Sequence, residues 1–248
     1  MPIQGTGNTF RPLSADPAPP PTVAREAPWL AGLRAARANV VPGLIVQALM
    51  LAVLLAYFFY PPTREWLDRL AEIKSRWSYG YTAIASVIAG ALIPELLRVL
   101  VFQKGQIRRE NGANLFFTIP FWCFMGIMVD FFYRCQAGWF GAEATFAVVV
   151  KKVVVDQFLY TPLFASPVTA WLYDWKNRDY RLADLQDFFT RDYYAGTIFP
   201  RLLAAWVVWI PVVSILYSLP SELQIPLFAL ALSLWVVLYT WMTEQQVP

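Results

Sequence analysis

Residues 40–60 have the sequence VVPGLIVQALMLAVLLAYFFY, which contains no charged side chain. As an α-helix this run is about 31 Å long, at about 1.5 Å per residue, and the hydrocarbon core of a bilayer is about 30 Å thick. That core holds no water for backbone amides, so a single crossing segment satisfies them only as a helix. The run therefore predicts a transmembrane helix and an all-α membrane protein.

The composition of the whole chain agrees with a membrane protein. Hydrophobic residues make up 58% of the 248 positions and charged residues 15%, with a mean hydropathy of +0.44, whereas about 25% of a soluble domain is charged. The chain has no histidine and two cysteines, which excludes a Ser-His-Asp triad, His-ligated zinc and a disulfide framework. The net charge of +3 comes from scattered basic residues, so we expect the lipid bilayer as a partner and no nucleic acid.

Five further apolar segments have the length of membrane spans, at about 79–102, 113–133, 149–173, 198–217 and 223–242. The last two are close enough in sequence to form one tight hairpin, so we expect an all-α polytopic bundle of about five to six transmembrane helices. Ser86 and Gly90 lie four apart and predict a close helix neighbour for the second span. Prolines in nearly every later span predict bent helices whose freed carbonyls are bonded by neighbours.

These segments divide the chain into three parts. Residues 1–38 combine a Pro-rich tail, expected to be disordered, with a short helix at the membrane surface near Trp29. Residues 39–78 hold the first span and an amphipathic connector, whose apolar side chains lie on one side (Trp66, Leu67, Leu70, Ile73 and Trp77). Residues 79–248 form the main membrane domain. Eleven Lys and Arg on the side of the termini, against seven on the other side, favour cytoplasmic termini.

Charged residues inside the apolar segments are the candidate functional residues, because a charge at the bilayer centre costs about 2.5 to 3.5 kcal/mol on insertion scales. Lys152 and Asp156 are four apart, which places them on one helix face, and Gln157 follows. They predict either an interior structural network or a solvated conduit, and the sequence supports both. Glu95 and Arg98 are three apart and predict either a self-neutralising pair or a polar patch that lines the same pathway.

The remaining charged residues have interfacial explanations. Asp130 and Arg134 are four apart near the end of the third span, so we expect an interfacial pair. Arg201 follows Pro200, which predicts a position in the first turn of a helix at the interface. The charged segment 174–192 lacks calcium-loop spacing and is expected to be a solvated, mostly helical connector. Because no Gly-rich phosphate loop, nucleophile elbow or CxxC motif occurs, we expect no enzymatic activity, cofactor or metal.

One block of the fourth span carries a family resemblance. Lys152-Val-Val-Val-Asp156-Gln157, with Pro162 six residues after the Asp, resembles the K-x-x-x-D-Q and Pro pattern of one membrane protein family. That family groups the twenty-two-kilodalton peroxisomal membrane protein with the mitochondrial inner-membrane protein Mpv-seventeen. Two later elements, at 193–200 and 209–211, are also similar to its pattern. The resemblance covers roughly residues 78–242 and leaves the first span as an addition to a four-helix family core.

The resemblance implies an integral membrane protein, and because several family members are regarded as weakly selective pores, it implies a channel for small solutes or ions. The chain has Leu203 and Trp206 where the family has polar residues. A non-catalytic scaffold or accessory subunit of a membrane complex, binding through the first span, is therefore the alternative. The expected protein partner is a second copy or another membrane protein. The Ala-rich sequence without a signal or transit peptide favours a bacterial inner membrane, with a mitochondrial inner or peroxisomal membrane as the alternative.

Overall fold

The computed structural model describes residues 27–244, apart from the side chains of Asp184 and residues 239–244. The predicted disordered tail at residues 1–26 lies outside this range. The part of the chain that is described is helical and has no strand. Five of its helices are long and apolar enough to cross a membrane, at 28–59, 79–102, 109–140, 191–217 and 221–238. The chain is therefore an all-α polytopic membrane protein, as its sequence predicts.

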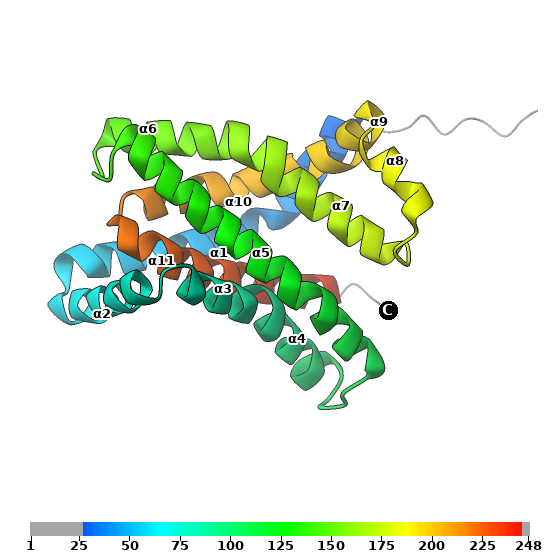
Figure 1. Cartoon of the computed structure of the whole chain (residues 1–248), viewed down its shortest axis with the longest axis horizontal. Coiled ribbons are helices and arrows are strands. Elements are labelled where there is room, and N and C mark those ends of the chain that lie inside the picture. Colours follow the sequence, from blue (N-terminus) through cyan, green and yellow to red (C-terminus); the bar gives the residue numbers. More distant parts are fainter. Residues whose placement is uncertain (1–26, 245–248) are drawn as a thin grey trace, which may run out of the picture.

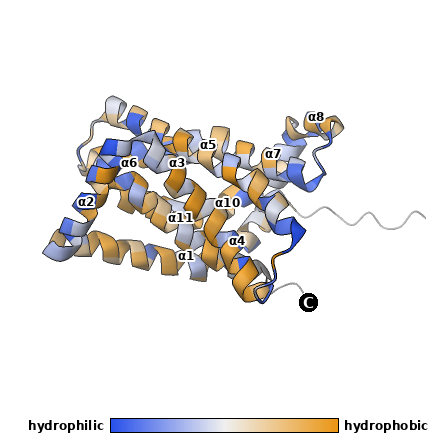
Figure 2. Ribbon diagram, turned by 60° about the horizontal axis from the view of Figure 1, so that its bottom comes forward, coloured by the Kyte–Doolittle hydropathy of each residue, from blue (hydrophilic) through white to orange (hydrophobic). Residues whose placement is uncertain are grey.

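The helices run between two ends of the bundle (Figure 1). Three of them finish at the same end, namely α1 (Pro28–Phe59), α5 (Arg109–Phe140) and α10 (Phe199–Tyr217). The short helix α2 (Pro61–Trp77) lies across this end, which we call the α2 end (Figure 2). Hydrophobic residues follow the lengths of the helices, and hydrophilic residues gather at the two ends (Figure 2). This distribution is the one that a bilayer around the bundle requires.

Of the other helices, some begin at the α2 end, and the remaining short ones lie in a connector at the opposite end. Those that begin at the α2 end are α3 (Tyr79–Val87), α6 (Phe146–Val155) and α11 (Ser221–Glu244). α3 continues through α4 (Ile93–Leu97) to Phe102, and α6 continues through a π-helical segment (Asp156–Ala165) into α7 (Ser166–Asn177). The connector after α7 holds α8 (Leu185–Phe188) and α9 (Arg191–Tyr193). The start of α1 and the end of α11 both lie at the opposite end (Figure 1).

α1 differs from the prediction, because residues 28–59 form one continuous helix. The separate surface helix predicted near Trp29 is wrong. Residues 29–39 are rich in Leu, Ala and Arg, which favour helix, and Pro42 lies inside α1 without ending it. α1 buries Val46 and Met50 in the same hydrophobic core as Leu216 of α10. The predicted added span is thus packed into the bundle.

The predicted fourth span, 149–173, is not among the five apolar spans. The helix from Phe146 to Asn177 is long and runs between the same two ends of the bundle (Figure 1). Its apolar stretch is interrupted by Lys151, Lys152 and Asp156, which lower its hydropathy. Lys152 and Asp156 are buried between helices, so their charges are turned away from the surface of the bundle.

Small residues let α5 approach the second span, as predicted. A Cβ atom on Gly90 would lie 2.2 Å from the ring of Trp122, and one on Gly126 would lie 2.1 Å from Ser86 Oγ. Glycine is therefore the only residue that fits either position without displacing its neighbour. The two contacts fix the separation of α5 and the second span.

We predict that Gly90→Ala lowers the free energy of unfolding by about 1 to 3 kcal/mol, because the added methyl group overpacks the Trp122 ring. The measurement is unfolding of the purified protein in detergent micelles. Gly138→Ala is the matched control, since no atom lies within 4 Å of a Cβ there, and it should leave stability unchanged or slightly raised. Equal effects of the two substitutions would contradict the packing assigned to Gly90.

Neighbouring helices bond carbonyls that prolines free, again as predicted. In a π-helix the Gln157 carbonyl would accept a hydrogen bond from the backbone N–H of residue 162, but Pro162 has no N–H. Trp206 Nε1 donates to that carbonyl instead, at 2.9 Å. Pro211 frees the Val207 carbonyl in the same way within α10, and Gln47 of α1 donates to it at 2.8 Å. Trp206 thus fills a structural role at a position where the sequence departs from the family pattern.

Candidate functional site

Asp156 is the centre of a buried hydrogen-bond network between α5, α10 and the π-helical segment. Its Oδ2 accepts a hydrogen bond from Tyr217 Oη at 2.6 Å, and its Oδ1 accepts from Gln157 Nε2 at 3.1 Å and from Thr161 Oγ1 at 3.2 Å. Gln136 Nε2 of α5 donates to Tyr217 Oη at 2.7 Å. The Asp156 carboxylate and the Tyr217 hydroxyl therefore join three elements, and Asp156 is only 4% exposed.

Lys152 does not pair with Asp156, although the two were predicted to share a helix face. Within the described residues, no hydrogen bond or ion pair reaches Lys152 Nζ, which instead lies over the Tyr217 ring, 5.8 Å from its centroid. The spacing between the two residues is α-helical, because the Asp156 N–H donates to the Lys152 carbonyl. The π-helix begins at Asp156, and one of its turns spans about five residues. It brings Thr161 to the carboxylate. The predicted residues are thus brought together, but Tyr217 and Thr161 bond the acid.

Glu95 and Arg98 form the predicted pair, with Arg98 Nη1 at 3.3 Å from Glu95 Oε2. Glu95 is buried and also accepts a hydrogen bond from Asn111 Nδ2 near the start of α5. Asn111 and Gln136 are about 37 Å apart along α5, at about 1.5 Å per residue. The structure therefore separates Glu95 and Arg98 from the Asp156 network, and they do not line one common polar patch with it.

A third polar cluster fastens α2 to the bundle. Lys74 Nζ and Arg134 Nε each lie 3.0 Å from Asp130 Oδ1, and Thr82 Oγ1 donates to Asp130 Oδ2 at 2.6 Å. Asp130 is 1% exposed and Lys74 is 6% exposed. The predicted pair of Asp130 and Arg134 is present, but it is part of a largely buried triad and not a simple interfacial pair.

The role of Lys74 was missed because the sequence places it among the charged residues of an amphipathic helix. Leu67 and Lys74 are the two buried residues of α2, and their separation of seven residues, about two helical turns, is the signal that places them on one face. Trp66 and Trp77, predicted on the same side as Leu67, are instead 69% and 60% exposed. α2 therefore turns Leu67 and Lys74 toward the bundle and a tryptophan stripe away from it.

Aromatic rings fill the interface between α5 and the helix 146–177, which we call the α5–α7 seam. The rings of Phe132 and Tyr160 stack with centroids 4.0 Å apart beside the Asp156 network. Farther along, Phe121 meets Tyr173 edge to face at 5.1 Å. At the opposite end, Lys176 Nζ lies over the Phe117 ring at 5.2 Å from its centroid. The seam thus runs from one end of the bundle to the other.

Several polar side-chain atoms, most of them on the two helices that form the seam, are buried without a hydrogen-bond partner. The described residues with such atoms are Gln103, Trp122, Gln136, Gln157, Tyr160 and Trp175. All of these except Gln103 belong to α5 or to the helix 146–177. Buried polar atoms in folded proteins are nearly always satisfied by protein or by water. Five unpartnered polar atoms therefore lie on the two helices that form the seam.

Two surface pockets are present at the α2 end. One, of about 530 Å³, is lined by Tyr57, Arg64 and Pro220 among others, and the second, of about 330 Å³, lies between α2 and the start of α11. Neither is lined by Lys152, Asp156 or Gln157. Lys152, Asp156 and Gln157 are buried, with 1%, 4% and 3% of each residue exposed.

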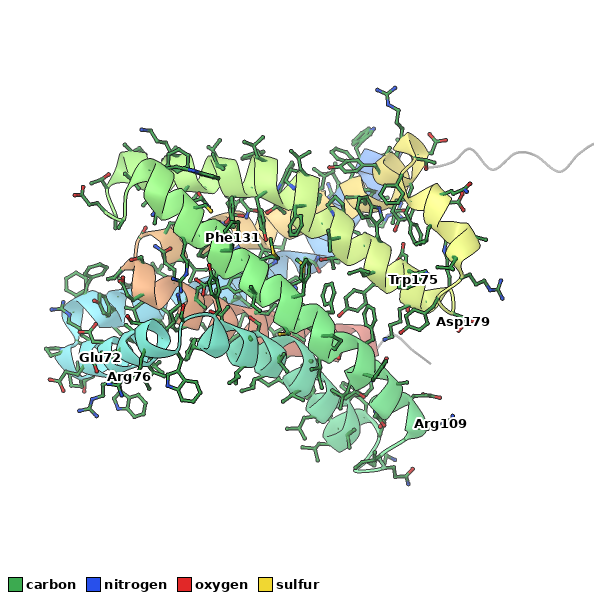
Figure 3. The ribbon with its side chains drawn as sticks, viewed as in Figure 1. Glu72, Arg76, Arg109, Phe131, Trp175 and Asp179 are labelled. Carbon is green, nitrogen blue, oxygen red and sulfur yellow. The ribbon has the colours of Figure 1, made fainter. Side chains whose placement is uncertain are left out.

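A hydrogen bond and an ion pair at Asp174 hold the connector after α7 in place. Asp174 Oδ2 accepts from Tyr193 Oη at 2.6 Å, and Arg201 Nη2 lies 3.3 Å from Asp174 Oδ1. Arg201 is more than half exposed, in agreement with its predicted interfacial position. Figure 3 shows Asp179 and Arg109 at this end of the bundle and Glu72 and Arg76 at the α2 end. Charged residues thus lie at both ends of the apolar region.

Comparison with known proteins gives no family assignment. No family model matches the chain, and no curated protein or solved structure matches it. The function must therefore be inferred from the polar clusters and the seam.

Proposed function

We propose that this integral membrane protein passes small hydrophilic solutes or ions along the α5–α7 seam. The observation that supports this proposal is the series of buried, unpartnered polar atoms on α5 and the helix 146–177. In a bilayer such atoms are costly unless water reaches them. A seam that admits water over its whole length is also a route for solutes of similar size.

The seam is closed where Phe132 and Tyr160 stack. Phe132 is 8% exposed and contributes to the main hydrophobic core. Tyr160 belongs to the π-helical segment, and such segments are frequent at functional sites. We infer that this ring pair is the constriction, and that separating the two rings opens the route beside Asp156.

The test is solute flux through liposomes that contain the purified protein. We expect swelling in urea or glycerol gradients, or current in KCl, above that of protein-free liposomes. Tyr160→Ala removes one ring of the constriction and should raise the flux several-fold. Leu163→Ala is the matched control, because Leu163 lies in the same π-helical segment and is 72% exposed. Its flux should equal that of the unaltered protein.

Circular dichroism and a single elution peak establish that each variant is folded before its flux is compared. If folded protein and folded Tyr160→Ala both give the flux of empty liposomes, the proposal is wrong. Flux that rises equally in Tyr160→Ala and Leu163→Ala would assign the leak to the lipid boundary and not to the seam.

The scaffold alternative is favoured by one observation on α1. Its outer face exposes Val41, Leu44 and Leu55, while its inner face packs on α10. A partner helix would cover the outer face, whereas lipid covers it in a solitary channel. Purification in mild detergent separates the two, because a stoichiometric membrane-protein partner without flux supports the scaffold.

The finer assignments remain proposals that the resemblance supports. These are membership of the family of Mpv-seventeen and the twenty-two-kilodalton peroxisomal membrane protein, and a place in a bacterial inner membrane, with a mitochondrial inner or peroxisomal membrane as the alternative. Localisation of a tagged chain in its own cells tests the membrane directly.

A further inference from the structure

We propose that Lys152 belongs to a binding site for a small oxyanion that also carries a hydrogen-bond donor, of the chemical class of bicarbonate. Lys152 is 1% exposed, yet across the described residues its ammonium group has no hydrogen-bond acceptor and no acidic partner. Its contact is the face of Tyr217. A buried ammonium group carries three donors and is costly without an acceptor, so the site lacks an acceptor that a ligand would supply.

Asp156 does not supply that acceptor. Its two oxygens are turned to Tyr217, Gln157 and Thr161, and the Lys152 ammonium lies beyond the 4.0 Å of an ion pair with it. The carboxylate is thus held by neutral donors, while the positive charge one helical turn away is left for another anion.

Two acceptors in the Asp156 network lack donors. Gln136 is fully buried and Gln157 is 3% exposed, and the Oε1 atom of each has no partner. Gln136 uses its amide nitrogen on Tyr217 Oη, and Gln157 uses its own on Asp156. The orientation of both amides is therefore fixed by what their nitrogens bond, and the two oxygens are left for a donor on the ligand.

These unpaired groups define the chemistry of the ligand. Lys152 requires a negative charge or an acceptor, and the two glutamine oxygens require an O–H or N–H group. Bicarbonate offers both in four heavy atoms. Nitrate has the same planar shape and charge without a donor, and urea has the same shape and donors without a charge. Comparing the binding of the three molecules therefore tests the need for a negative charge and the need for a donor separately.

The experiment measures ligand binding to the full chain in detergent micelles, by calorimetry and by the shift of the thermal unfolding midpoint, at constant pH and ionic strength. We expect bicarbonate to bind and to raise the midpoint. Nitrate and urea should bind at least about tenfold more weakly, since each leaves one set of buried groups unpaired. Lys152→Met should weaken bicarbonate binding by about tenfold or more.

Lys151→Met is the matched control, because Lys151 is the adjacent lysine and is exposed, and it should leave binding unchanged. If Lys152→Met fails to fold, Gln136→Leu gives the second measurement, and it should bring bicarbonate down to the level of nitrate. Equal binding of bicarbonate and nitrate would show that the site does not require a donor on the ligand. No binding of either to the unaltered chain would show that the site holds water only. Each of these results would overturn the inference.

The role of this anion as a transported solute rests on the proposed function, whereas its binding does not. Binding without liposome flux would keep the site and remove the conduit. Flux without binding would keep the conduit and remove the site.

Discussion

Asp130→Ala is expected to lower the free energy of unfolding by about 3 to 5 kcal/mol. The reason is Lys74, which is 6% exposed and lies 3.0 Å from Asp130 Oδ1. Removing one partner of a buried ion pair leaves the other charge without compensation, and that charge carries the penalty. Arg134 is 44% exposed, so its guanidinium group regains water and contributes less. The measurement is chemical unfolding in micelles, followed by circular dichroism.

The double variant Asp130→Leu with Lys74→Met tests the cause. Removing both charges should restore most of the lost stability, because a buried ion pair is often replaceable by apolar residues of similar volume. Glu72→Ala is the control on α2, since Glu72 is exposed and lies at the α2 end (Figure 3). Should the double variant be as unstable as Asp130→Ala alone, the unpaired lysine is not what destabilises it.

The spans could be predicted from the sequence because they depend on the hydropathy of local segments. The second span, 79–102, is found with the predicted bounds. The third was predicted at 113–133, whereas α5 extends from 109 to 140. Arg134 and Gln136 end the apolar run but not the helix, and their side chains bond Asp130 and Tyr217. The change from apolar to polar residues therefore marks the end of the apolar surface and not the end of the helix. The helix ends at Phe140, and the next residue, Gly141, has a φ of +97°.

The polar clusters were predictable only where both partners lie on one α-helix. The pairs Glu95 with Arg98 and Asp130 with Arg134 follow from spacings of three and four. Their other partners come from elements distant in the chain, as Lys74 does for Asp130. No single-helix spacing indicates such contacts. Asp156 is the opposite case, because it does not pair with Lys152 on the same helix face and α10 provides Tyr217 as its partner.

Asp156→Ala is expected to lower the free energy of unfolding by about 2 to 4 kcal/mol. The substitution leaves the hydroxyl groups of Tyr217 and Thr161 and the amide of Gln157 without their acceptor, and each unsatisfied buried donor costs about 1 to 3 kcal/mol before the structure relaxes. Asp156→Asn keeps one oxygen, which still accepts from Gln157 and Thr161. It should therefore lose less, and the unfolding of the two variants in micelles gives the order.

A double-mutant cycle isolates the bond that joins the π-helical segment to α10. Tyr217→Phe removes only the hydroxyl group, so it leaves the ring contact with Tyr133 at 4.9 Å intact. Combined with Asp156→Ala, it should cost less than the sum of the single effects, with a coupling of about 1 to 3 kcal/mol. Tyr194→Phe is the comparison, because its hydroxyl bonds the Pro162 carbonyl and not Asp156. Additive losses for Asp156 and Tyr217 would mean that their 2.6 Å contact does not hold α10 to this helix, and the closed seam would then depend on its aromatic rings alone.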